Sequence, residues 1–177
     1  EGSPGRDWNV ATGMVIEGKA GFQIMGDWAK GEFTAAGKVP GVDYYCAATP
    51  SNNGYLYNVD SFIFYKSSDP DKQAGQKLLA KLMMGKNFQK VFNLYKGSIP
   101  ARLDVSMDEF DKCAKTSNAD IKTAGASGGL VPSFAHGMAQ GNTMKAALQD
   151  IITEHFNSDM SSVDAANALA DSVLANM

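Results

Sequence analysis

Apolar residues recur every three to four positions through most of the chain, the spacing that places them on one face of an α-helix. The clearest helix start is Asp69-Pro70, because aspartate caps a helix N-terminus and proline suits the first helical position. Gly85 is well placed to end that helix. The pattern predicts helices over residues 7–17, 28–36, 70–84, 87–95 and about 107–115, and two final helices whose apolar faces span 144–155 and 163–173.

Strand-like runs are fewer and lie in the first half of the chain. Short apolar runs rich in aromatic and β-branched residues predict strands over 21–25, 42–48 and 55–66, the last being the longest. Residues 123–133 are loose and rich in glycine, so we expect a loop there. The predicted fold class is α/β and helix-rich. Because a sheet covered by helices usually has more strands than these, we infer that part of the sheet lies outside this chain.

The bulk composition narrows the functional classes. A chain of 177 residues fits one domain or one and a fraction, and its 44% hydrophobic and 20% charged residues are ordinary for a globular protein. A net charge of −3 without a basic stripe gives no reason to expect nucleic acid as a partner. No apolar run approaches the roughly 20 residues of a membrane span. Residues 1–6 lack signal-peptide features, and a processed start would look the same, so the compartment stays open.

The two cysteines, Cys46 and Cys113, could form a disulfide or remain free thiols. If they are bridged, the closed loop of about 67 residues stabilises the fold by on the order of 4 kcal/mol. Two buried free thiols are the equally plain alternative. An extracytoplasmic setting would favour the bridge.

The most informative segment is Gly18–Phe33. Its apolar run stops at Gly26-Asp27, and Trp28 follows at the opening of the predicted helix. An aromatic ring just past a strand end, beside backbone N–H groups, suits a small polar ligand. By base rates of burial, a core position for Trp28 is the competing interpretation.

The sequence of this segment resembles the "GkaAM…GdWa" region of bacterial solute-binding proteins that deliver sugars to ABC importers. Residues 57–71 are similar to the return strand of that family running into a helix. Residues 72–102, which close with Gly97-Ser-Ile-Pro-Ala-Arg102, are similar to its next helical region. The resemblance covers nearly the whole chain and implies a binding function without chemistry.

The order and spacing of Trp28, Asp60, Lys96 and His136 are similar to those of the glucose/mannose-binding branch. The resemblance implies that Trp28 stacks on a hexose while the other three hydrogen-bond its hydroxyls. This fits sugar chemistry, since apolar C–H faces and a ring of hydroxyls call for an aromatic plate plus polar groups. Asn58 is a weaker candidate on the strand face of Asp60. As alternatives, Lys96 is a cation favoured at a helix C-terminus, and Asn58 is a turn residue at the strand end.

The resemblance further implies a periplasmic-binding-protein type II-like lobe that is incomplete without an N-terminal lobe. Residues 1–56 and 99–177 would form the C-terminal lobe, and residues 57–98 would cross the hinge and pack on the absent lobe. The implied ligand is a monosaccharide, glucose first and then mannose or galactose. The implied partner is an ABC permease, the compartment is the periplasm, and no cofactor is needed. We therefore expect exposed apolar surface along residues 70–95.

Two alternatives remain open. Gly125-Ala-Ser-Gly-Gly129 matches the nucleophile elbow of a serine hydrolase, with Ser127 as nucleophile, but that elbow needs a buried strand before it and a helix after it. The residues before it are too polar for a central strand, so a loop explains the match better. The second alternative is a solute-binding protein for a disaccharide or a non-sugar ligand. The sequence contains no HExxH, CxxC or phosphate-loop pattern that would support metal or nucleotide chemistry.

Overall fold

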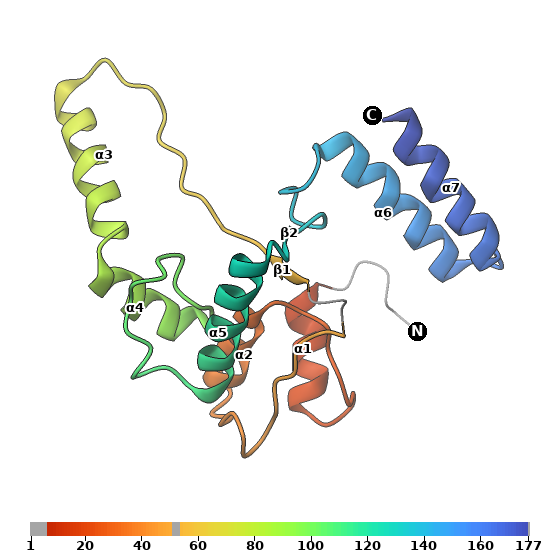
Figure 1. Cartoon of the computed structure of the whole chain (residues 1–177), viewed down its shortest axis with the longest axis horizontal. Coiled ribbons are helices and arrows are strands. Elements are labelled where there is room, and N and C mark those ends of the chain that lie inside the picture. Colours follow the sequence, from red (N-terminus) through yellow and green to blue (C-terminus); the bar gives the residue numbers. More distant parts are fainter. Residues whose placement is uncertain (1–6, 51–53, 177) are drawn as a thin grey trace. The chain divides into compact units, whose positions relative to one another are not determined.

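The computed structural model describes residues 7–50 and 54–176 (Figure 1). They divide into two compact units, the first with residues 7–50 and 59–128 and the second with residues 54–58 and 129–176. Seven α-helices, one 3₁₀ helix and two short strands occur in these ranges. In chain order they are α1 (Trp8–Ile16), η1 (Asp27–Ala29), α2 (Lys30–Ala35), β1 (Tyr55–Tyr57), α3 (Pro70–Met83), α4 (Lys86–Lys96), α5 (Lys112–Ser127), β2 (Leu130–Pro132), α6 (Asn142–Asn157) and α7 (Ser162–Ala175).

Most predicted helices are confirmed, because their end signals act locally. The Asp69 carboxylate accepts the N–H groups of Asp71 and Lys72, and Pro70 takes the first position of α3. The predicted helix over 28–36 is the 3₁₀ turn η1 continued by α2. Gly97 ends α4 with φ 88°, a left-handed conformation that favours glycine.

The predicted helix at about 107–115 and the predicted loop over 123–133 are wrong in their bounds. Helix α5 starts at Lys112, where the Asp111 side chain accepts the N–H of Ala114, and it continues to Ser127. Residues 130–132 then form β2. The helix was missed because its sequence is rich in alanine and small polar residues, which favour or tolerate a helix without marking an apolar face.

The predicted strands are the least accurate part. Of the run 55–66, residues 55–57 form β1, which pairs in parallel with β2 in the register Tyr55↔Leu130 and Tyr57↔Pro132. Residues 21–25, 42–48 and 58–66 are not strands among the described residues. A strand needs a neighbouring backbone for its N–H and C=O groups, and the described parts of the chain supply none here. Phe22 and Ile24 are accordingly 94% and 83% exposed.

The first unit has a small core beside a disulfide. Phe33 of α2 is buried and stacks on Tyr44 with ring centroids 4.2 Å apart, and Phe110 and Ala114 are also buried. The Lys30 ammonium lies 2.7 Å from the Asp111 carboxylate, with the lysine side chain only 7% exposed. Cys46 and Cys113 form a disulfide with Cα atoms 5.7 Å apart. The bridge, rather than two free thiols, is therefore the state of these cysteines.

The second unit consists of the β1–β2 pair and a helical hairpin. Helices α6 and α7 pack against each other (Figure 1), burying Met144 and Ala165. The Ser161 hydroxyl caps α7 by accepting the N–H of Asp164.

The apolar exposure expected along residues 70–95 is confirmed. Leu78 and Leu82 of α3 are 70% and 59% exposed, and Tyr95 of α4 is 83% exposed. Scattered surface leucines are ordinary, whereas a series on neighbouring helices is typical of an interaction surface. The expected division at residues 56 and 98 concerns packing against another lobe and stays a prediction.

Candidate functional site

Trp28 is held against the backbone at Gly26. A Cβ atom added at residue 26 would lie 2.1 Å from Cζ3 of the indole ring, so the half-buried ring occupies the space that any other side chain would need. Glycine at this position therefore leaves room for the ring to lie against the backbone. The Gly-Asp-Trp motif thus forms a tight turn in which the tryptophan is neither fully buried nor fully exposed.

The start of α2 and the end of α4 meet backbone to backbone. A Cβ added at Gly31 would lie 2.8 Å from the carbonyl oxygen of Lys96, and one added at Gly97 would lie 2.5 Å from the N atom of Gly31. Both distances are too short for a real side chain, so both positions require glycine. This contact brings the chain just after Trp28 to the chain at Lys96.

Asp27 makes a second connection between the same two segments. Its carboxylate accepts the backbone N–H of Ile99 at 2.8 Å, across 72 residues of sequence. Burial raises the pKa of Asp27, and the Ile99 N–H and the Lys30 ammonium oppose that rise. The sequence analysis treated Asp27 only as the end of a strand, since nothing local signals a partner so far along the chain.

The structure brings Asp60 and Lys96 together as an ion pair. Lys96 Nζ lies 2.5 Å from Asp60 Oδ2, with the two side chains 31% and 64% exposed. The ammonium also lies 6.0 Å from the centroid of the Phe92 ring. An exposed pair of this kind contributes at most about 1 kcal/mol to stability, so a ligand can replace it at low cost. It presents a donor and an acceptor side by side, which matches a hydroxyl group.

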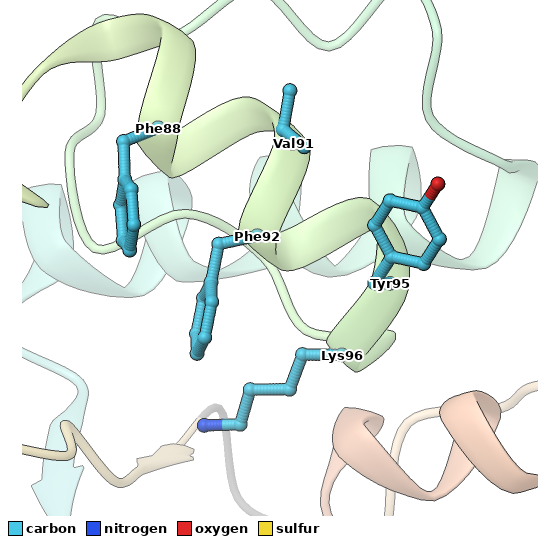
Figure 2. Close-up of a pocket in the computed structure, with 5 residues that line it drawn as sticks. All are labelled: Phe88, Val91, Phe92, Tyr95 and Lys96. Atoms are coloured by element: carbon cyan, nitrogen blue, oxygen red, sulfur yellow. The ribbon is translucent and has the colours of Figure 1, made fainter.

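Lys96 also borders a surface pocket of about 540 Å³ (Figure 2). The pocket is formed along one helix, and Figure 2 shows the Lys96 side chain running beneath Phe92 while the Tyr95 ring turns to the other side. The rings of Phe88 and Phe92 are stacked with centroids 5.5 Å apart. This apolar face is part of the exposed surface expected along residues 70–95. Its lining residues are Phe88, Val91, Phe92, Tyr95 and Lys96.

The other two predicted residues belong to the second unit and share an edge of its sheet. Asn58 directly follows β1, and Ser133 directly follows β2 and donates its N–H to the Tyr57 carbonyl. The buried Ser133 hydroxyl lies 2.6 Å from Nδ1 of His136. With the hydroxyl as donor, a neutral ring carries its proton on Nε2, which is then a hydrogen-bond donor. The carboxyl ends of parallel strands are a common location for ligands.

The predicted site residues thus fall into two groups. Trp28, Asp60 and Lys96 belong to the first unit, whereas Asn58 and His136 belong to the second. Sequence reasoning missed Asp27 and Ser133, which contact the segments that carry these side chains. Ser133 lies only three residues before His136, whereas the partner of Asp27 lies 72 residues away and has no local signal.

The geometry around Ser127 is the reverse of a nucleophile elbow. Helix α5 precedes this serine and strand β2 follows it, and the Ser127 hydroxyl donates to the Ala124 carbonyl at 3.2 Å. An elbow requires the strand first and the helix second. The hydrolase alternative therefore loses its structural basis.

The described residues also bear on metal binding and on membrane insertion. Within residues 7–50 and 54–176, no three His, Cys, Asp or Glu side chains gather in a way that could hold a metal ion. No helix in those ranges is both long enough and apolar enough to cross a membrane.

Known proteins resemble this chain over nearly its whole length. A "Probable sugar-binding periplasmic protein" of Brucella suis is 48% identical over 170 residues, covering 96% of this chain and 40% of the relative. An "Uncharacterized ABC transporter extracellular-binding protein" of Pyrococcus horikoshii is 35% identical over 150 residues, covering 84% of this chain and 33% of the relative. A "Xylose/arabinose-binding protein" of Haloferax volcanii is 28% identical over 171 residues, covering 94% of this chain and 36% of the relative.

No protein-family model matches the chain. The chain spans about two fifths of the length of the first of these relatives.

Proposed function

We propose that this chain is part of a periplasmic solute-binding protein that binds a monosaccharide between two lobes and delivers it to an ABC-type permease. The observation that carries the proposal is the 48% identity to a periplasmic sugar-binding protein across 96% of the chain. The exposed Asp60–Lys96 pair supports it, because the pair offers the hydrogen-bonding groups that a sugar needs. No bond is made or broken in this function, so the protein is not an enzyme.

In the proposed complex the ion pair opens to admit the sugar. One hydroxyl donates to the Asp60 carboxylate, and a neighbouring hydroxyl accepts from the Lys96 ammonium. Trp28 stacks on the apolar face of the ring, where C–H groups meet the indole. The resemblance to sugar-binding proteins adds His136, as a donor through Nε2, and Asn58, as an amide, to the proposed ligand groups. Contacts from both sides of the cleft favour the closed form, which the permease recognises.

The proposal includes an N-terminal lobe that this chain does not contain. Residues 57–98 would cross the hinge and pack on that lobe, and the fold would be of type II. Two observations support this: the relatives are more than twice as long as the aligned region, and strand-like residues such as Ile63 are 79% exposed. A neighbouring sheet and helix layer would cover them. Asp60 and Lys96 would then lie near the hinge, and Trp28 on the C-terminal lobe.

Glucose is the first candidate ligand, followed by mannose and galactose. The name of the Haloferax volcanii relative adds pentoses to the sugars worth testing. A disaccharide or a non-sugar solute is the second candidate class. A calorimetric panel of glucose, mannose, galactose, xylose, arabinose, maltose and an amino acid distinguishes these classes. The sugars differ in hydroxyl pattern, in the presence of a hydroxymethyl group or in the number of rings, and the amino acid represents a non-sugar solute.

The decisive test is calorimetric titration of D-glucose into the intact polypeptide that contains this chain. We expect Asp60→Ala and Lys96→Met each to weaken binding by about tenfold or more, because each removes a charged hydrogen bond to the sugar. The chain provides a matched control on the same helix. Lys90 and Glu109 form an ion pair at 2.7 Å, with side chains 29% and 63% exposed.

Glu109→Ala and Lys90→Met therefore remove an equivalent surface ion pair outside the proposed site. Both should leave the affinity for sugar unchanged. Equal losses in the two pairs would show a general effect of surface charge and contradict the site. If the parent protein gives no binding heat with any member of the panel at millimolar concentration, the proposed ligand class is contradicted.

A further inference from the structure

We propose that Asp27 is a positioning residue of the sugar site. Its side chain fixes the position of Trp28 relative to Lys96. The inference rests on the proposed function, since it takes Trp28 and Lys96 as ligand groups. It goes beyond that function by assigning a role to a half-buried carboxylate that does not touch the sugar. The role is to join the turn that carries the aromatic plate to the turn that follows the cation.

The first part of the evidence is connectivity. Asp27 directly precedes Trp28, and its carboxylate accepts the N–H of Ile99 at 2.8 Å. Ile99 lies three residues after Lys96, just beyond the left-handed Gly97 that ends α4. A shift of the tryptophan turn relative to the end of α4 therefore breaks this hydrogen bond.

The second part is the glycine contact on the other side of Trp28. Gly31 and Gly97 allow the backbones of α2 and α4 to touch, with no room for a Cβ atom on either. The tryptophan turn is thus held on both sides. Before Trp28, Asp27 bonds to Ile99, and after it, the backbone of Gly31 contacts that of Gly97. Two separate contacts restrain both sliding and rotation, whereas one alone would leave a pivot.

The third part is the choice of residue. Partial burial of the Asp27 carboxylate costs free energy that an apolar residue at the same corner would not cost. Lys30 lies next to Asp27 in space but directs its ammonium to Asp111 at 2.7 Å. The groups that specify an acceptor at residue 27 are therefore the Ile99 N–H, which donates to it at 2.8 Å, and the neighbouring Ser98 hydroxyl. An amide side chain has an acceptor oxygen as well and should fill the same role without charge.

The test compares four variants of the intact polypeptide: Asp27→Ala, Asp27→Asn, Gly31→Ala and the control Gly13→Ala. A Cβ at Gly13, also within a helix, meets nothing within 4 Å. Two quantities are measured, the affinity for D-glucose and the fluorine NMR resonance of Trp28 in protein labelled with fluorotryptophan. The resonance is assigned by its loss in Trp28→Phe, and it reports the environment of the ring without any sugar.

We expect Asp27→Ala and Gly31→Ala to shift or broaden the Trp28 resonance and to weaken glucose binding by about tenfold. Asp27→Asn should keep the Trp28 resonance and the glucose affinity of the parent protein, and Gly13→Ala should change neither. Rescue by asparagine separates positioning through the Ile99 N–H from a need for the charge itself. Melting temperatures recorded in parallel identify any variant that is simply unfolded.

An unchanged Trp28 resonance and an unchanged affinity in Asp27→Ala would overturn the proposal. So would a failure of Asp27→Asn to restore a folded, labelled protein to the parental resonance. If the parent protein binds no sugar while Asp27→Ala still moves the Trp28 resonance, the proposed function fails and the coupling of the two turns is upheld. The two ideas are therefore separable in one set of samples.

Discussion

Removal of the Cys46–Cys113 disulfide is expected to lower the free energy of unfolding by about 4 kcal/mol. The bridge joins residues 67 positions apart, and in the chain-entropy model a loop of this length removes roughly 15 cal/mol/K from the unfolded chain. At 25 °C that entropy corresponds to about 4 kcal/mol. Because Cys46 is exposed and Cys113 half-buried, replacing both by alanine removes little packing. The loss therefore reports the crosslink itself.

Urea unfolding followed by circular dichroism measures this loss. The oxidised parent, the reduced parent and Cys46→Ala/Cys113→Ala are compared in the intact polypeptide. With a slope of about 2 kcal/mol per molar urea, the midpoint should fall by about 2 M in the last two samples. Reductant added to the double variant should have no effect. A loss below about 1 kcal/mol would refute the reasoning, because the crosslink would then not restrict the unfolded chain.

Three predictions concern buried and surface groups of the first unit. Lys30→Met should lower stability by about 2 kcal/mol in the same urea assay, because it leaves the half-buried Asp111 without its ammonium. Burial alone would raise the pKa of Asp111, but the Lys30 ammonium and the N–H groups of Ala114 and Cys113 together outweigh it, so the pKa is lowered. The stability present above pH 3.8 is therefore lost as pH falls through the lowered value. That acid-side loss should be smaller in Lys30→Met, and an identical pH profile would contradict the assignment. Burial raises the pKa of Tyr44 to about 12 from 10.0, so stability should fall as pH rises between these values. Tyr44→Phe should reduce that fall. The tyrosinate absorbance of the parent minus that of Tyr44→Phe isolates this phenol among the six tyrosines, and a difference that titrates near pH 10 would contradict the prediction.

The features that the sequence predicted well depend on neighbours within a few residues. Asp69-Pro70 starts a helix because the aspartate side chain reaches N–H groups two and three positions ahead. Gly97 ends α4 because it alone adopts the left-handed conformation at no cost. The amphipathic pattern of α4 and α6 likewise repeats within each helix. Such signals need no knowledge of the rest of the fold.

The features that sequence reasoning missed depend on distant partners. Residues 21–25 have the composition of a strand, but a strand forms only where another backbone lies beside it. Helix α5 has Ile121 as its one large apolar residue, so an apolar period could not be recognised although alanine favours a helix. The bond from Asp27 to Ile99 spans 72 residues, a separation at which no periodic pattern carries information. The Asp60–Lys96 pair was identified by resemblance, and only the structure shows that the two groups are in contact.

The pairing of β1 with β2 has a consequence for biosynthesis. Strand β1 lies in the middle of the first unit's sequence, yet its partner is made roughly 70 residues later. At the usual pace of translation, about 5–20 residues per second, β1 leaves the ribosome several seconds before β2 exists. For that interval the nascent chain carries the unpaired backbone of β1, whose central residue is Leu56. The second unit is thus completed late, and its earliest strand must stay unpaired until the ribosome has passed residue 132.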